Sequence, residues 1–140
     1  MNIIDVSPTL VACALLTFAL CSCTVTSGSS PSSGSTSSGT VSVLSSIEGN
    51  TPASECDSVG ASSLELAVYE GSSLYTTVTA SCSDFQVTVS LPDGDYSGDA
   101  TLLDGHSQPV STTLTMNNLR VISGTDLQIN IDFPTSSILP

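Results

Sequence analysis

The chain has 140 residues, which is room for one domain of ordinary size. It carries 13 acidic side chains and a single basic one, Arg120, for a formal charge of −12. A surface of this kind repels phosphate backbones, because it has no basic patch and cannot release counterions, so nucleic acid is excluded as a partner.

The N-terminal segment contains a predominantly apolar run at residues 9–20. Its length fits the central part of a signal peptide and falls short of the ~20 residues that span a bilayer as a helix. Residues 1–8 contain Asp5 and no basic residue, unlike the positively charged start of most signal peptides. We predict a removable targeting peptide, with an uncleaved anchor as the alternative.

The sequence Leu20-Cys21-Ser22-Cys23 resembles the lipobox of bacterial lipoproteins, in which a small residue precedes the lipidated Cys. Cys23 fits that pattern better than Cys21, which would follow the bulky Leu20. The resemblance implies a signal peptide at 1–22, a lipid anchor on Cys23, and a location in the cell envelope facing the periplasm or the cell surface. Plain secretory cleavage is one alternative, and an uncleaved anchor or a cytosolic chain is the other. Removing residues 1–22 also removes Asp5, which changes the charge from −12 to −11.

Residues 24–40 consist almost entirely of Ser, Thr, Gly and Pro. Such a stretch buries too little apolar area to offset the entropy of ordering its backbone. We therefore predict that residues 23–40 are the lipidated Cys and a disordered tether. A Gly/Ser coil of this length separates its ends by roughly 20–25 Å on average.

From residue 41 onward apolar residues recur with a period of two, as in Phe85/Val87/Val89/Leu91 and Leu127/Ile129/Ile131/Phe133. The pattern predicts an all-β domain over 41–140, a single antiparallel β-sandwich with about seven strands. The expected strands lie near 41–47, 63–70, 74–81, 85–91, 95–103, 109–116 and 127–133. No segment of comparable length has a helical period with caps.

Leu91-Pro92-Asp93-Gly94-Asp95-Tyr96 resembles the Leu-Pro-x-Gly-x-Tyr turn of Ig-like, fibronectin-like and transthyretin-like sandwich modules of bacterial surface proteins. Pro92 presets φ for a turn and Gly94 gives a permissive backbone. The Tyr96 hydroxyl is then expected to bond to the backbone a few residues upstream, as in a tyrosine corner. The resemblance bears on the fold and not on activity.

Processing at Cys23 would leave two thiols, Cys56 and Cys82, in a chain routed to an oxidising compartment. We predict a single disulfide between them. A metal site built on these thiols and one distant His is the weaker alternative, because structural zinc needs four ligands.

The segment from Asp93 to Asp104 offers oxygen atoms at the spacing of an EF-hand loop, with calcium candidates at Asp93, Asp95, Ser97, Asp99 and Asp104. Position 12 of that loop is Asp rather than the usual Glu, and neither flank is helical. The competing interpretation places 93–95 in a hairpin turn and 96–103 in the following strand, and we favour it.

Groups for catalysis are few. His106 follows Asp104 and Gly105 in an expected loop, and it is interpreted as an exposed loop residue. Glu65 with Glu70, or Asp93 with Asp99, are the carboxylate pairs that an acid/base mechanism would need, but no cationic or Trp-rich surroundings accompany them. We predict no catalytic residue and no cofactor.

The sequence therefore predicts a non-catalytic cell-envelope lipoprotein that presents a small β-sandwich as a structural or protein-binding module. Its partners would be the membrane, through the lipid anchor, and a protein recognised through an exposed sheet face, for which the Ser/Thr-rich strands 74–81 and 109–116 are the place to look. The alternatives are a calcium-binding β-domain using Asp93 to Asp104, and a small secreted hydrolase using Asp93, Asp95 or His106.

Overall fold

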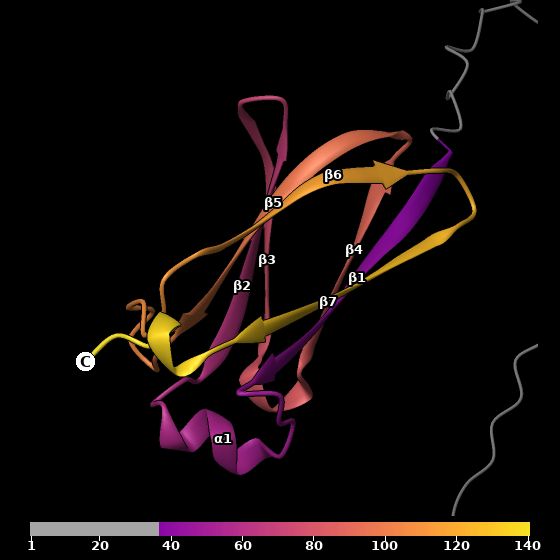
Figure 1. The fold of residues 1–140 in the computed structure, drawn as a ribbon. Coiled ribbons are helices and arrows are strands. Elements are labelled where there is room, and N and C mark those ends of the chain that lie inside the picture. The colour runs from indigo at the N-terminus through magenta and orange to yellow at the C-terminus, as the bar shows by residue number, and fades with distance from the viewer. Residues whose placement is uncertain (1–36) are drawn as a thin grey trace, which may run out of the picture. The chain divides into compact units, whose positions relative to one another are not determined.

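The computed structural model describes residues 37–140, so that the predicted signal peptide, Cys23 and the tether up to residue 36 lie outside the described residues. Seven strands form two packed sheets (Figure 1). The strands are β1 (Ser38–Ile47), β2 (Ser63–Glu70), β3 (Ser73–Ser81), β4 (Gln86–Pro92), β5 (Gly94–Leu103), β6 (Leu114–Val121) and β7 (Asp126–Phe133). The helical elements are α1 (Ala53–Ser58) and two single turns, η1 (Cys82–Asp84) and η2 (Thr135–Ser137). The predicted all-β sandwich is confirmed.

The strand order is β4-β1-β7 in one sheet and β3-β2-β5-β6 in the other. Neighbouring strands are antiparallel except β1 and β7, which run parallel from the pair Thr40/Asp126 to the pair Ile47/Phe133. In constant-type immunoglobulin domains the first two strands share a sheet. Here β1 pairs with β4 and β7 instead, so the likeness to those domains extends to the two-layer architecture and not to the connectivity.

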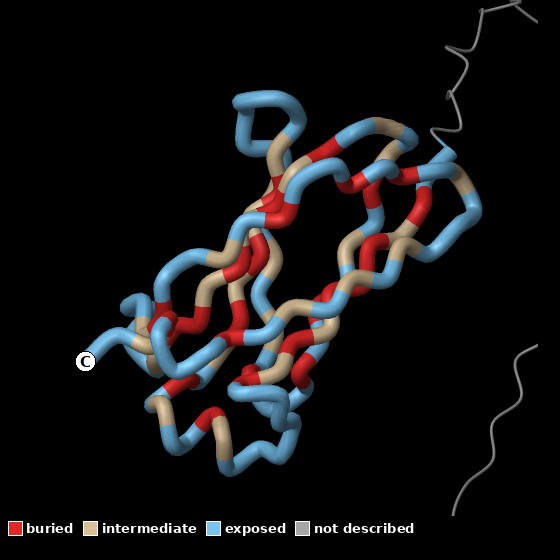
Figure 2. Tube along the Cα trace, in the orientation of Figure 1, coloured by how far each residue is buried: buried red, intermediate tan, exposed pale blue. Residues whose placement is uncertain are grey.

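The core lies between the two sheets and is built from alternate residues of the strands (Figure 2). Leu64, Leu66 and Val68 of β2 are almost completely buried, whereas Glu65 between them is half-buried on the other face. This is the period-two pattern expected from the pleat of a strand. β7 keeps the same alternation, but its apolar residues are only half-buried until Phe133, which is fully buried. As an edge strand, β7 has a neighbour on one side only.

The sixth strand was predicted at 109–116 and is found at 114–121, so that prediction is wrong for residues 109–113. Those residues make only isolated bridges, from Pro109 to Leu103 and from Ser111 to Ile138. The strand's later half was missed because the register of β6 shifts near Asn118, whose φ is 61°. An extra residue in a bulge interrupts the alternation on which the prediction relied.

Two further features differ from the prediction, an additional helix and the start of β1. The helix α1 was not expected, because six residues are too few to show a helical period, and only Cys56 is buried in it. β1 begins at Ser38, so residues 38–40 belong to the sheet rather than to the tether. The backbone N–H of Thr40 donates to the Thr125 carbonyl at 2.9 Å, and its hydroxyl donates to Asp126 at 2.9 Å. Pairing with β7 thus orders residues whose composition alone predicts disorder.

Gly39 is the residue in this part of β1 that tolerates no side chain. A Cβ there would overlap the Ile122 carbonyl oxygen, and would lie 2.9 Å from Val121 Cγ1 and 3.0 Å from the Thr125 carbonyl oxygen. Two of these atoms are backbone and cannot rotate away. Gly39→Ala is expected to lower the free energy of unfolding by about 1–3 kcal/mol, as overpacking does. Urea unfolding measures this, and Gly105→Ala, where a Cβ meets open space, is the control with little expected change. Equal stability of the two variants would contradict this prediction.

Candidate functional site

The Leu91–Tyr96 motif carries the chain from one sheet to the other, because β4 and β5 belong to different sheets. The predicted hairpin turn at 93–95 is therefore wrong, whereas the predicted strand after it is present as β5. The Tyr96 hydroxyl donates to the Pro92 carbonyl at 3.2 Å, which confirms the expected tyrosine bond. Burial raises the pKa of Tyr96, and its ring meets Tyr75 edge-on, with 5.6 Å between centroids. The bond from Tyr96 to Pro92 thus connects the start of β5 to the end of β4 where the chain crosses between the sheets.

The five calcium candidates do not surround a common point. Gly94–Leu103 is an extended strand, so Asp95 and Asp99 lie roughly 13 Å apart along it rather than on a curled loop. Asp95 faces Arg120 at 3.9 Å on the surface, and Asp99 accepts a hydrogen bond from the Thr115 hydroxyl at 2.8 Å. Within residues 37–140, no group of three or more His, Cys, Asp or Glu side chains is placed to hold a metal ion.

Asp104 is bound by the backbone of the loop that follows β5. Its carboxylate accepts hydrogen bonds from the backbone N–H groups of His106 at 2.7 Å and Gln108 at 2.8 Å. These two bonds hold the pKa of Asp104 below its usual range, and the bond from Gln108 has the larger effect. The loop after β5 thus closes on this carboxylate.

The remaining catalytic candidates are also separated. The His106 side chain is 91% exposed, and its Nδ1 lies 3.8 Å from an Asp104 oxygen. Glu65 and Glu70 are an odd number of residues apart on β2 and therefore point to opposite faces of an extended strand. Asp93 lies at the bend just before β5, and Asp99 lies roughly 17 Å along β5 from the first residue of that strand, Gly94. The structure brings neither carboxylate pair together.

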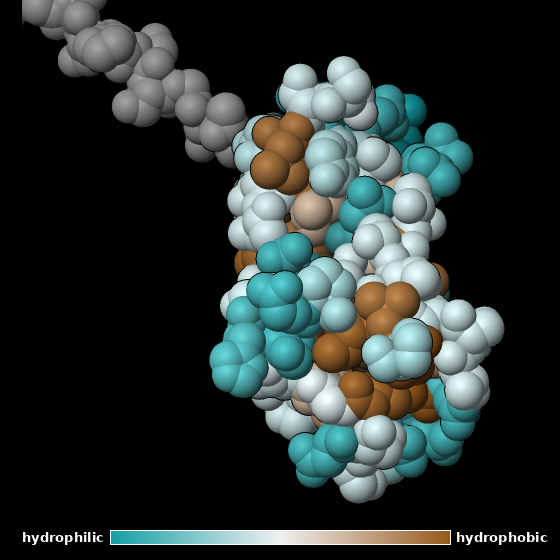
Figure 3. All heavy atoms as spheres, turned by 90° about the vertical axis from the view of Figure 1, so that its left-hand side faces the viewer, coloured by the Kyte–Doolittle hydropathy of each residue, from teal (hydrophilic) through white to brown (hydrophobic). Residues whose placement is uncertain are grey.

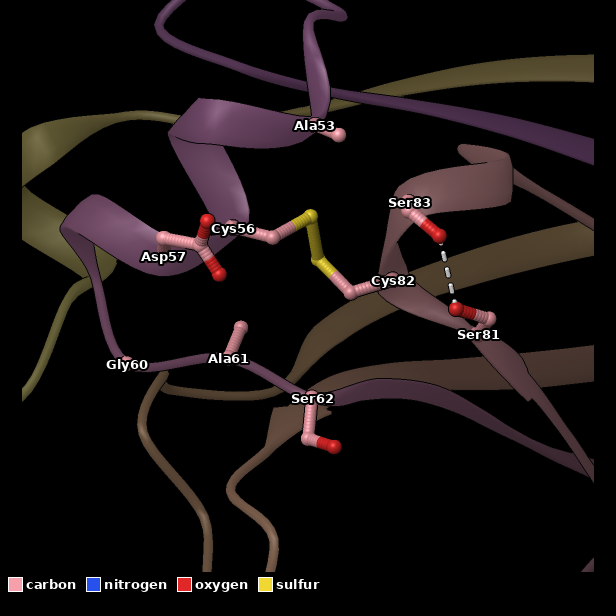
Figure 4. A pocket seen from close by; sticks show the side chains of 9 residues that line it. All are labelled: Ala53, Cys56, Asp57, Gly60, Ala61, Ser62, Ser81, Cys82 and Ser83. Atoms are coloured by element: carbon pink, nitrogen blue, oxygen red, sulfur yellow. Dashed lines mark hydrogen bonds between the residues drawn. A yellow bond between two sulfur atoms is a disulfide. The ribbon is translucent and has the colours of Figure 1, made fainter.

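The predicted disulfide is present and links Cys56 of α1 to Cys82 of η1, with 6.0 Å between their Cα atoms. An open pocket of about 410 Å³ lies over it (Figure 4). The lining is small and neutral apart from one carboxylate, and consists of Ala53, Cys56, Asp57, Gly60, Ala61, Ser62, Ser81, Cys82 and Ser83. The lining serines have no His or Lys beside them to act as a base. The disulfide fixes the end of β3.

A second concave region lies where α1 meets the C-terminal residues, the side from which Figure 3 views the molecule and on which apolar surface gathers. A pocket of about 300 Å³ there is lined by Ile47, Val59 and Ile138, with Glu48 and Glu55 contributing acidic groups. Nothing in this pocket identifies a ligand, and its apolar residues belong to the core or pack against it.

The four edge strands differ in how well they are protected against further pairing. β7 carries Asp126 and Asp132, and β6 carries Arg120 and the bulge near Asn118. Charges and bulges at these positions discourage another strand from adding to the sheet. By contrast, the stretch Gly71–Ser83, which contains β3, has no charged residue. β3 is the longest uncharged edge of the sandwich.

The backbone of β3 leaves hydrogen-bonding groups free. The Cys82 N–H donates to the Ser62 carbonyl at 3.0 Å, which sets the phase of the antiparallel β2/β3 ladder. Because bonded and non-bonded pairs alternate, the N–H and C=O groups of Thr77, Thr79 and Ser81 point away from β2. All three residues are exposed. We call Thr77–Ser81 the free edge of β3; the sequence had indicated this strand as a place for a partner.

The described residues thus define a disulfide-bonded two-layer β-sandwich with an uncharged free edge. Comparison with protein-family models, curated proteins and solved structures found no match. In residues 37–140 no helix has the length and apolar character needed to cross a membrane.

Proposed function

We propose that this protein is a non-catalytic lipoprotein of the bacterial cell envelope that presents its β-sandwich as a protein-binding module. The observation that carries the binding role is the free edge of β3. A partner strand that adds there gains main-chain hydrogen bonds from Thr77, Thr79 and Ser81, and the half-buried side chains of Val78 and Ala80 give it an apolar surface to cover.

The anchoring role rests on the lipobox-like Leu20–Cys23 and on the composition that follows it. With β1 starting at Ser38, the proposed tether is residues 24–37, which as a Gly/Ser coil spans about 20 Å on average. That length holds the sandwich clear of a headgroup layer. The several acyl chains of a bacterial lipoprotein anchor far more stably than one chain does.

The anchor is tested by the intact mass of protein extracted from bacterial membranes with detergent. We expect the mass of residues 23–140 plus lipid, and loss of both processing and membrane association in Cys23→Ser. Cys21→Ser is the matched control, because residue 21 lies two positions from Cys23 and this variant should still be lipidated on Cys23. A chain that retains Met1, or lipid that persists in Cys23→Ser, would overturn the proposed anchor.

A further inference from the structure

We propose that the partner of the β3 free edge is the β3 free edge of a second copy of this chain. The two strands would pair antiparallel around a two-fold axis at Thr79 and join two four-stranded sheets into one of eight strands. This inference rests on the proposed function, since it names the partner of that same edge.

The first argument is that the free edge is complementary to itself. Antiparallel pairing centred on Thr79 places Thr77 of one copy opposite Ser81 of the other, and Thr79 opposite Thr79. By symmetry Ser81 of the first copy also lies opposite Thr77 of the second. Each of the three pairs exchanges two backbone bonds, because the N–H and C=O groups of all three residues point outward. Every free group of the edge therefore finds a partner in a single register.

The side chains agree with that register. On the inner face it sets Val78 of one copy directly opposite Ala80 of the other, twice, in the pairs where side chains approach most closely. Both residues are half-buried in the single copy and pack against the core, so a second copy would complete their burial. On the outer face the pairs are Thr with Thr and Thr with Ser, which stabilise sheets through hydroxyl contacts.

Charge restricts where two copies can meet. Residues 37–140 contain 12 of the 13 acidic residues and the single Arg, so two copies repel each other over most of their surface. The uncharged stretch Gly71–Ser83 is an exception. Glu65 is the acidic residue paired with Thr79 on β2, and the two Glu65 side chains would be three strand spacings apart, about 14 Å. That separation exceeds the Debye length of about 8 Å at physiological ionic strength.

The first test traps the pair with Thr79→Cys in the lipidated protein purified in detergent. At a bonded antiparallel pair the Cα atoms are about 5.5 Å apart, which a disulfide can bridge. We expect a dimer on a non-reducing gel, with peptide mapping that joins Cys at 79 to Cys at 79. Thr88→Cys is the matched control, since Thr88 is an exposed Thr on the other uncharged edge, β4. No 79–79 link, or a link from Thr88→Cys alone, would overturn the inference.

The second test uses proline and sedimentation. The Thr79 N–H does not bond to β2, so Thr79→Pro removes an outward donor while leaving the β2/β3 ladder in place. We expect the native chain to sediment with twice the protein mass of one chain, and Thr88→Pro to behave like the native chain. Thr79→Pro should have the protein mass of one chain and the far-ultraviolet circular dichroism of a folded sandwich, with a lower melting temperature because the partner copy no longer stabilises the folded state. A monomeric native chain would overturn the proposed self-pairing. The intact mass of the same preparation tests the anchor separately, because residues 23–140 plus lipid would still support it.

Discussion

Replacing both Cys56 and Cys82 with alanine is expected to lower the free energy of unfolding by about 3.5 kcal/mol at 25 °C. The bond closes a loop with a sequence separation of 26 residues and so restricts the unfolded chain. Both residues are 3% exposed, and the bond ties α1 to the turn between the two sheets, so its loss also frees native structure. For a small domain whose net stability is about 5–15 kcal/mol, this is a large share.

Urea unfolding of the purified chain measures the disulfide's contribution, with and without reductant. The matched control is Ser81→Ala with Ser83→Ala, which removes an exposed 2.8 Å hydroxyl contact beside the same bond and should cost less than about 0.5 kcal/mol. If the reduced native chain and the double alanine variant unfold at the same urea concentration as the oxidised chain, the disulfide does not stabilise the domain.

Phe133→Ala is expected to cost about 3–5 kcal/mol, the range for truncating a fully buried aromatic side chain. Phe133 is 0% exposed and ends β7, where it pairs with Ile47 at the end of the parallel β1/β7 ladder. Its carbonyl also accepts the Glu48 N–H at 3.1 Å. Removing the ring would therefore leave a cavity in the core beside the C-terminal ends of β1 and β7.

Thermal and urea unfolding check this prediction against Ile122→Ala. Ile122 is a large apolar residue that is 53% exposed, so its truncation should change stability by less than about 0.5 kcal/mol. Comparable losses in the two variants would show that the burial at Phe133 contributes no more than a surface residue does.

Much of the fold followed from local patterns. Alternation located six of the seven strands to within a few residues, because each of them has one face in the core. It failed at β6, where the bulge near Asn118 shifts the phase, and at residues 38–40, where pairing with β7 orders a polar segment. Local composition carries no information about either event, since both depend on a strand more than ten residues away.

The candidate site was predictable in part. Strand 74–81 was predicted to offer an exposed sheet face to a partner, and the structure places that strand at an edge. Which backbone groups remain free was not expected, because that depends on the phase of the β2/β3 ladder. The calcium-loop spacing from Asp93 to Asp104 is a local pattern that did not predict a site. Most of these residues lie in the extended strand β5, so their oxygen atoms do not converge on one point.

The sequence by itself determined the all-β class and the role of the Tyr96 hydroxyl, because both depend on residue type and short spacing. It also determined the Cys56–Cys82 pair, which is 26 residues apart, because only these two cysteines follow the N-terminal segment. The tertiary structure alone decided that β1 lies between β4 and β7, that the Leu91–Tyr96 turn crosses between sheets, and that β3 is left at an uncharged edge. Strand order is fixed by which apolar faces pack together over the whole domain, and no local stretch encodes that choice.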